Sequence, residues 1–351
     1  MINFIIKRIL NGILVLLGVA IVIFVVFKIM PGDPAKMMLG QRSDKSTIEA
    51  LNKEYYLDKP LSTQFIYFIN DLSPLSVHKN DTINQKKYTY VRVCVIRDIA
   101  LVAKAPYLGR SFQSKRFVSD IIWDRFPSTA ILALVSMIFA TLVGVFFGVV
   151  SALNQNKFWD RFLVTISIFG ISVPSFVSAV LLGLLFAVFL REYTGLNLFG
   201  SLYEYHAFEG KSLQLKNLLL PALTLGIRPL AIIVQLTRSS MIEALGEDYI
   251  RTAKSKGLSE NKVVYKHALR NALNPVVTAV SGWFAGLLAG AFFVEKVFNW
   301  KGIGLETINA VFNLDFPVVI GSTLFIGLIF IIISILVDIM YAWLDPRVRL
   351  Q

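Results

Sequence analysis

The side chains that most often catalyse reactions or bind metals are few in this sequence and do not cluster. Its single cysteine, Cys94, cannot form an intramolecular disulfide, and its three histidines are scattered. No metal-ligand spacing occurs, and neither a phosphate-binding G-x-x-x-x-G-K-[ST] loop nor a nucleophile–base pair stands out. We therefore expect no catalytic residues, no metal and no cofactor, and the chain is not predicted to be an enzyme.

The most informative polar stretch lies between two apolar runs, from Thr237 to Pro275. Its pattern predicts two helices joined by a tight turn. Lys254 and Lys256 end the first helix, where the helix dipole favours cations. Gly257 then occupies the position just past a helix end that favours a left-handed conformation, and an apolar residue follows it.

The second helix of this stretch is predicted to begin after Ser259, which is a favourable N-cap, with Glu260 in the first turn. Pro275 marks where the helix passes into the next apolar run. At a spacing of four residues, its predicted apolar face holds Tyr265, Leu269 and Leu273.

The elements that flank this stretch are predicted to cross a membrane. Of the 351 residues, 55% are hydrophobic and 17% are charged, against about 25% charged in soluble domains. Uncharged runs of 29, 27, 24 and 21 residues start at positions 162, 129, 271 and 317, and about 20 residues cross a bilayer. We predict an all-α membrane protein with six spans at about 9–30, 128–153, 162–190, 218–236, 272–294 and 317–343.

The positions of Lys and Arg predict the orientation of the spans. With the N-terminus inside, the inner segments hold 13 of these residues and the short outer loops hold five, so both termini are predicted to be cytoplasmic. The net charge of +12 therefore indicates topology rather than nucleic-acid binding. The first apolar run, Ile9 to Phe27, is 19 residues long and has no cleavage signal after it, so we expect it to be retained.

A long polar segment, 31–117, follows the first span and is predicted to lie outside the cytoplasm. Residues 1–117 thus form one part of the chain, and 118–351 form a core of five spans. The aromatic residues from Tyr55 to Phe68 predict short helices on the membrane, and the alternation from Tyr88 to Ile96 predicts a strand.

Polar and proline residues inside the spans have two possible roles. Arg228 could face a pathway and attract a carboxylate, because a charge in a span suggests function. We favour the alternative, in which Pro229 breaks the helix and Arg228 reaches water or pairs with a carboxylate. Asp338 is predicted to pair with a cation or with interfacial water. Pro174 and Pro221, like Pro229, are predicted to mark kinks, which could be hinges or simply structural.

The helix–Gly–helix stretch resembles the "EAA" coupling loop of ABC-importer permeases, in the form found in the oligopeptide/dipeptide permease family. Arg251-Thr-Ala-Lys-Ser-Lys-Gly-Leu258 and His267-Ala-Leu-Arg-Asn-Ala272 carry this resemblance. Further matching segments occur in order along the chain: Met30–Pro34, Leu108–Ser111, Ser172–Phe176, Gly302–Gly304 and Asp338–Arg347. About 35 residues, roughly 73–105, look inserted relative to the family pattern.

The resemblance implies a MetI-like permease, the first (B-type) membrane subunit of an ATP-driven peptide importer in the cytoplasmic membrane. Its implied partners are a second similar permease, two cytoplasmic ATPase subunits, an extracytoplasmic substrate-binding protein and membrane lipid. The residues implied to couple the chain to the ATPases are Glu243, Ala244, Tyr249, Arg251, Ala253, Lys256, Gly257, Leu258, Arg270 and Pro275. The candidate pathway residues are Pro174, Arg228 and Pro229.

Other functions remain open at this point. Within the family the substrate could be oligopeptides, dipeptides, nickel complexes or sugars, and the sequence does not choose among them. An ion-coupled secondary transporter would place carboxylates or histidines at midplane, and no acidic residue is central in any predicted span. This observation argues against that class.

Overall fold

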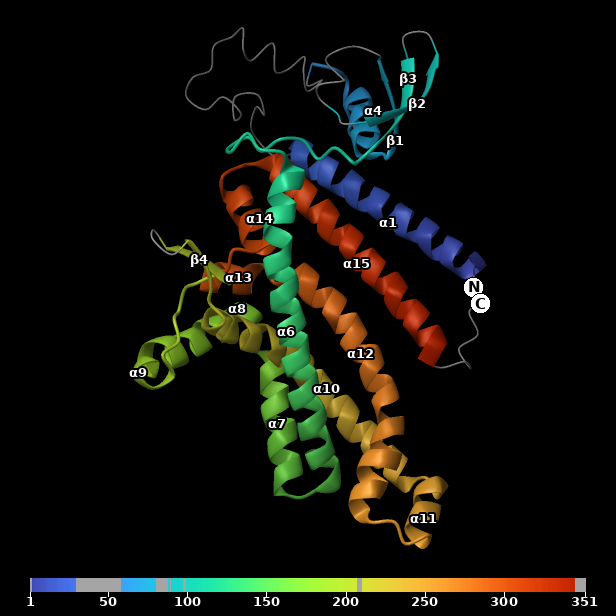
Figure 1. Ribbon diagram of the computed structural model, residues 1–351, viewed down its shortest axis with the longest axis vertical. Helices are drawn as coiled ribbons and strands as arrows, with labels where there is room; N and C mark the ends of the chain where they lie inside the picture. The colour runs from blue at the N-terminus through green and yellow to red at the C-terminus, as the bar shows by residue number, and fades with distance from the viewer. Residues whose placement is uncertain are drawn as a thin grey trace. The chain divides into compact units, whose positions relative to one another are not determined.

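Long apolar helices dominate the computed structural model (Figure 1), which describes residues 2–29, 58–79, 88, 90–96, 99–206 and 210–344. The chain divides into two compact units. Unit 1 comprises residues 1–10, 125–306 and 328–351, and unit 2 comprises residues 11–124 and 307–327. Four helices contribute residues to both units: α1 (Ile2–Ile29), α6 (Val118–Leu153), α14 (Ile303–Phe312) and α15 (Phe316–Leu344).

Five helices in the described ranges are long and apolar enough to cross a membrane. A helix satisfies its own backbone hydrogen bonds, which hydrocarbon cannot do, and this favours unbroken helices in these segments. The five lie at Ile6–Phe27, Val118–Leu153, Lys216–Gly246, Lys262–Ala289 and Phe316–Ile339. They correspond to five of the six predicted spans.

The remaining predicted span, 162–190, is not one straight helix. Helix α7 (Phe158–Ser172) is followed by α8 (Ser175–Leu182) and by the π-helical segment η1 (Gly183–Phe189), and the two parts are bent by 110°. Val173 is extended, with φ −88° and ψ 128°, because a residue that precedes proline disfavours the helical region. Pro174 therefore causes the break, and the kink that the sequence predicted at this residue is confirmed.

Helix α10 (Lys216–Gly246) contradicts the expectation of a break at Pro229, because it continues through both Pro221 and Pro229. Its backbone lies very close to α6. A Cβ added at Gly144 would meet the Ile233 side chain at 2.8 Å, and one added at Gly226 would meet the Ser136 carbonyl oxygen at 2.8 Å. Glycine at these positions lets the two helices pack closely, and this packing supports the proline-containing helix.

The core of unit 1 lies between α6, α8, α10 and a C-terminal group of elements. This group contains α12 (Leu269–Gly290) and α13 (Phe292–Phe298), and its largest fully buried side chains include Phe298 and Trp300. The Trp300 indole nitrogen donates a hydrogen bond of 3.1 Å to the Ser128 carbonyl oxygen. Between α8 and α10 lie the short helix α9 (Arg191–Thr194) and a hairpin of β4 (Tyr203–His206) and β5 (Gly210–Leu213).

Unit 2 contains a small α/β element. Helix α4 (Leu61–Leu72) precedes an antiparallel sheet of order β1-β3-β2, formed by Leu75–Lys79, Tyr90–Ile96 and Ile99–Lys104 as β1, β2 and β3. The predicted strand is confirmed as β2. Phe24 of α1 packs against Phe65 of α4, with ring centroids 5.2 Å apart. Tyr55 to Leu57, which were also predicted to be helical, lie outside the described residues.

The segment of unit 2 that precedes α6 is held in place by a buried carboxylate. Asp315 accepts hydrogen bonds from the Ser111 hydroxyl and from the backbone N–H groups of Phe112 and Gln113. Ser111 belongs to one of the sequence segments that carry the family resemblance. Its role in this structure is to fix the chain that leads into α6 against the turn between α14 and α15.

Glu295 is a fully buried carboxylate that joins three parts of unit 1. Its Oε1 accepts a hydrogen bond of 2.6 Å from the Thr129 hydroxyl of α6, and its Oε2 accepts one of 2.9 Å from the Leu305 N–H of α14. Thr129 in turn accepts a hydrogen bond from the Ile303 N–H. Burial raises the pKa of Glu295 to about 7, although these hydrogen bonds act in the opposite direction.

The raised pKa of Glu295 predicts a pH-dependent stability. Because an unfolded glutamate titrates near about 4.3, the folded protein binds more protons between that pH and about 7. Stability should therefore fall as the pH rises through this window, by roughly 3 kcal/mol, and level off above it. Melting temperatures of the detergent-extracted protein at pH 5 to 8 measure this effect. The decrease of melting temperature with rising pH should be smaller in Glu295→Gln and unchanged in Glu306→Gln. Equal pH dependence of the melting temperature in both variants would contradict the prediction.

Candidate functional site

The 238–275 loop, defined as the chain between Arg238 and Pro275, contains the predicted pair of helices. Helix α10 ends at Gly246, α11 spans Asp248–Ser255, and the second helix continues through the π-helical segment η2 (Lys262–Ala268) into α12. Figure 1 shows α11 and the start of the second helix at the end of unit 1 where the turn between α6 and α7 also lies. The loop is thus a folded helical segment at one end of the long helices of unit 1.

The turn between the two helices has the geometry that the sequence predicted. Gly257 has a φ of +73°, in the left-handed region. Its N–H donates to the Lys254 carbonyl oxygen at 2.9 Å, and the Leu258 N–H donates to the Ala253 carbonyl oxygen at 3.4 Å. This pair of hydrogen bonds is the Schellman motif, which uses two carbonyl groups left free at the end of α11. The predicted left-handed glycine is confirmed.

The predicted apolar face of the second helix is confirmed at Leu269 and Leu273, which pack against buried cores, and was wrong at Tyr265. Tyr265 is exposed, and the buried positions are Val263, Val264, Ala268 and Ala272. A π-helix has one more residue in each hydrogen-bonded turn than an α-helix, so η2 shifts the phase of the face that follows it. A spacing of four residues could not predict this shift.

A small hydrophobic core fastens the loop to the adjacent helices. It contains Met241 and Ala244 of α10, Ile250 and Ala253 of α11, Val263, Val264, Ala268 and Ala272 of the second helix, and Val149 and Ala152 of α6. Because this core is continuous from α6 to α12, a force on α11 is transmitted to the ends of three long helices. The loop is therefore mechanically part of unit 1.

The residues implied to contact an ATPase fall into two groups in the structure. Ala244 and Ala253 are buried in the small core, and Leu258 packs against it. The other seven are exposed and form the accessible surface of the loop: Glu243, Tyr249, Arg251, Lys256, Gly257, Arg270 and Pro275. The structure therefore assigns the two alanines to folding the loop and leaves the exposed group free for contact.

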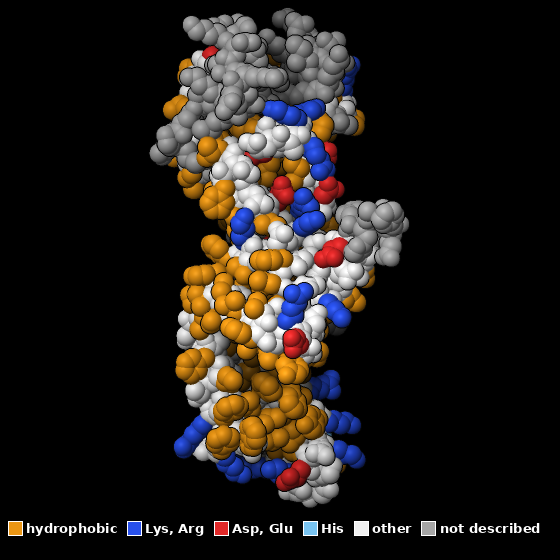
Figure 2. Space-filling model, turned by 90° about the vertical axis from the view of Figure 1, so that its left-hand side faces the viewer, with side chains coloured by type: hydrophobic (Ala, Val, Ile, Leu, Met, Phe, Trp, Pro, Cys, Tyr) orange, Lys and Arg blue, Asp and Glu red, His pale blue; other side chains and the backbone are white. Residues whose placement is uncertain are grey.

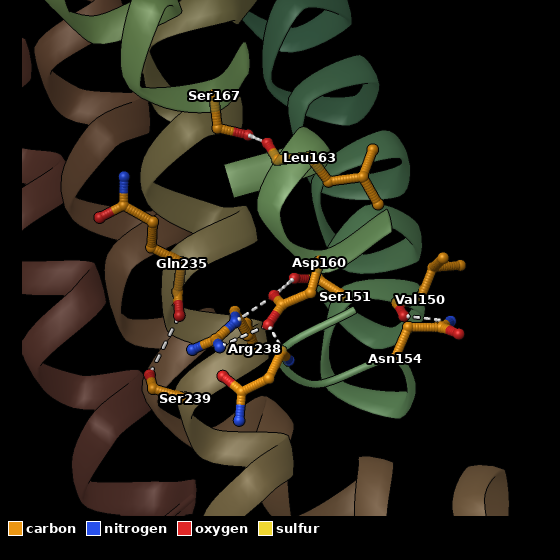
Figure 3. Close-up of polar contacts among 10 residues, drawn as sticks. Val150, Ser151, Asn154, Asp160, Leu163, Ser167, Gln235, Arg238 and Ser239 are labelled. Carbon is orange, nitrogen blue, oxygen red and sulfur yellow. Dashed lines mark hydrogen bonds and ion pairs between the residues drawn. The ribbon is translucent and has the colours of Figure 1, made fainter. Parts of the chain in front are cut away.

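The polar residues at this end of unit 1 include a buried ion pair. Arg238, where α10 enters the loop, donates from Nε to Asp160 Oδ1 at 2.6 Å and from Nη2 to Oδ2 at 2.8 Å (Figure 3). The same carboxylate accepts hydrogen bonds from the Ser151 hydroxyl and the Asn156 N–H. One carboxylate thus ties together α6, the α6–α7 turn, α7 and α10.

Sequence reasoning missed this ion pair. The predicted third span began at 162, which left Asp160 in a loop, whereas α7 begins at Phe158 and places Asp160 in its first turn. An available signal was the position of the carboxylate, because acidic residues are favoured at helix N-termini. Arg238 was counted only as a topology marker. By contrast, the predicted pairing of Asp338 is confirmed by a contact of 3.0 Å with Arg8 Nε.

Among the residues that the structure describes, no hydrogen bond or ion pair brings the three candidate pathway residues together. Pro174 begins α8 at the 110° bend, and Pro229 is buried within α10. Arg228 is exposed on α10 and makes no hydrogen bond or ion pair to any residue that the structure describes. The expected carboxylate partner is therefore not found in the described part of this chain.

One face of the chain carries a broad apolar area beside a group of basic side chains. Figure 2 shows one face on which hydrophobic side chains form a broad area, with Lys and Arg side chains gathered at the end near the loop. Between Arg238 and Arg270 the chain carries seven Lys or Arg residues. An apolar belt with a basic end is typical of a protein that crosses a membrane.

The long apolar helices and the helix–Gly–helix loop packed on their ends define a multi-span membrane protein. Comparison with known families agrees with this class. Residues 144–350 match the model of the binding-protein-dependent transport system inner membrane component, and residues 1–133 match the N-terminal part of the same system's membrane component. The chain belongs to this family.

Similar proteins and structures agree with the family assignment. The chain is 36% identical over 349 residues to the glutathione transport system permease protein GsiC of Escherichia coli O6:H1 and to that of Salmonella typhimurium, covering 99% of each chain. It also resembles two crystal structures of the inward-facing MetNI methionine ABC transporter. In one of them, 65% of this chain aligns with 97% of the other at a TM-score of 0.51 and 16% identity, which shows a shared fold.

Membership of this family determines the general role of the chain. It is a multi-pass inner membrane component of an ABC importer and not an enzyme, because partner ATPases hydrolyse the ATP. A substrate-binding protein is the other partner that membership of the family implies.

The buried ion pair predicts a large effect of losing Arg238. Arg238→Met leaves Asp160 buried without its cation, which should cost about 3–5 kcal/mol. Arg161→Met is a matched control, since Arg161 lies next to Asp160 but is exposed. Melting temperature in detergent should fall in the first variant and barely change in the second, and Asp160→Leu combined with Arg238→Met should recover part of the loss. Equal melting temperatures for the two single variants would refute the role of the pair.

Proposed function

We propose that this chain is a peptide permease that opens alternately to each side of the membrane, driven by ATPase subunits that bind the 238–275 loop. The single observation that carries the proposal is the construction of the loop. Its exposed residues surround a small core that is shared with α6, α10 and α12. A partner that moves the exposed surface therefore moves three long helices together.

The substrate class follows from the relatives. The two GsiC proteins are named for glutathione transport and match this chain over 99% of its length. Glutathione is a small peptide, so a peptide is the substrate class that this similarity supports. A nickel complex or another small solute is the alternative within the family.

A second, similar permease completes the proposed assembly, together with two ATPase subunits. The exposed surface of α12 supports this view, because Cβ atoms added at Gly282 and Gly286 would meet nothing within 4 Å. Small residues four positions apart let helices approach closely in membranes. This face of α12 is therefore available to a partner helix.

We further propose that both termini are cytoplasmic and that the segment after α1 is extracytoplasmic. Single cysteines in a Cys94→Ala background test this topology. An impermeant thiol reagent applied to intact cells should label positions 114 and 211 and should not label positions 157 and 256. Labelling at position 256 from outside would overturn the proposed orientation, and permeabilised cells should give signal at all four positions.

The left-handed turn offers the sharpest test of the coupling role. Valine at Gly257 has open space around its Cβ but must adopt a φ of +73°, which costs of order 1–3 kcal/mol for a β-branched residue. Gly257→Val should therefore disturb the loop without touching the spans. We expect normal accumulation in the membrane, together with the loss of substrate-stimulated ATP hydrolysis and of uptake by the reconstituted importer.

Two control variants separate this conformational effect from the effect of a new side chain. Gly246→Val adds the same side chain to the same loop, also in open space, at a position without positive φ. Gly257→Asn retains a residue that tolerates the left-handed region. Both should retain most of the activity. Transport by Gly257→Val at the wild-type rate would show that the loop does not couple the chain to the ATPases.

A further inference from the structure

Helix α10 exposes a narrow strip within an otherwise buried helix. Two thirds of its most apolar stretch are buried, against about one third in α6 and α12 and less in α1. Three polar residues of α10 are exposed or partly exposed and follow one another at intervals of seven and four residues. They are Arg228, Gln235 and Ser239, and we call them the α10 strip. Positions separated by seven or eleven residues share one side of a helix.

The α10 strip is polar, unlike the exposed faces of helices that face lipid. Helix α6 exposes Leu134, Ile138, Leu142 and Phe146 at intervals of four residues. Such an apolar face is stable in hydrocarbon, whereas a guanidinium, an amide and a hydroxyl are not. Helix α12, which packs along α10, also exposes polar positions: Asn271, Asn274 and Thr278. Each of these polar faces is therefore suited to water or to another protein.

Arg228 lies deep in this polar strip. It follows the first residue of α10, Lys216, by twelve positions, which is about 18 Å along the helix axis. The exposed guanidinium has no hydrogen-bond or ion-pair partner among the residues that the structure describes. A cation on a membrane-spanning helix is stable only beside water or an anion, so Arg228 is suited to bind an anion.

Gln235 supplies a second free polar group on the strip. In Figure 3 its side-chain amide points away from the Arg238–Asp160 pair, while its backbone carbonyl accepts a hydrogen bond from the Ser239 hydroxyl. The amide thus stays available, two helical turns from Arg228. A guanidinium binds a carboxylate through two parallel hydrogen bonds, and an amide can bind a peptide group.

We infer that Arg228 binds a carboxylate of the substrate peptide as it passes along the α10 strip, and that Gln235 contacts the peptide backbone. This inference rests on the proposed function. Arg228 would thereby favour peptides that carry a free carboxylate as they move along the α10 strip. The competing role for the same side chain is an ion pair with a carboxylate of the partner permease, and the experiments below distinguish the two.

The first experiment compares peptide uptake by the importer reconstituted with Arg228→Met, Arg228→Lys or Lys216→Met. The substrates are a free peptide, its C-terminally amidated form, and amidated forms with and without an acidic side chain. Because the same binding protein delivers all of them, its own preferences cancel when free-to-amidated uptake ratios are compared between importers.

Arg228→Met should reduce the ratio about tenfold, since one hydrogen-bonded charge is lost. Lys216→Met removes a cation from another face of the same helix and should leave the ratio unchanged, and Arg228→Lys should restore part of it. If Arg228→Met instead reduces the uptake of amidated peptides only when they carry an acidic side chain, Arg228 binds that side-chain carboxylate and not the terminal one. An equal loss for every peptide overturns the inference, and so does the absence of any change.

The second experiment measures accessibility without relying on transport. In the Cys94→Ala background, Arg228→Cys should react with small water-soluble methanethiosulfonates in the assembled importer, whereas Leu142→Cys on the apolar face of α6 should not. Modification with the trimethylammonium-ethyl reagent should restore the uptake ratio, and the sulfonatoethyl reagent should not. An unreactive Arg228→Cys refutes the aqueous strip. A wild-type importer that moves no peptide refutes the proposed function instead, and labelling still tests the strip.

Discussion

The constraint on which the rest of this structure depends is the cost of leaving a charge or a backbone polar group without a partner in hydrocarbon. The long helices satisfy their backbone groups internally, and the buried carboxylates are each surrounded by donors. Asp160 receives a guanidinium, a hydroxyl and an amide, while Glu295 receives a hydroxyl and a backbone amide of α14. These carboxylates also occupy the junctions between elements, so satisfying them fixes the helix ends, including the end of the helix that enters the 238–275 loop.

The loop and the spans are therefore one mechanical body rather than a surface appendage. The small core ties α11 and η2 to α6, and the Arg238–Asp160 pair ties α10 to α7 at the same end of unit 1. A hydrophobic core resists deformation because its side chains are closely packed. A stiff connection of this kind is needed if motion of the ATPases is to reach helices that lie in the bilayer.

Much of the fold could be predicted from the sequence, because hydrophobic runs and glycine positions report local physics. Five spans, strand β2 and the positive φ of Gly257 follow from the length of apolar runs, from alternation and from turn chemistry. The kink at Pro174 could also be predicted, because a residue that precedes proline disfavours the helical region. The 110° size of the bend and the π-helical segment η2 could not be predicted, because tertiary contacts decide them. The Asp160–Arg238 pair joins residues 78 positions apart, and no local pattern reports such a contact.

The π-helical segment η2 sets the direction in which the exposed surface of the 238–275 loop faces. Over Lys262–Ala268 the chain contains one residue more than an α-helical path between the same ends requires. Each residue of an α-helix turns the chain by about 100°. The extra residue therefore sets a rotational offset between the exposed side of the loop and the faces of α12. A chain that is one residue shorter here could keep every contact side chain and still present that surface in a different direction.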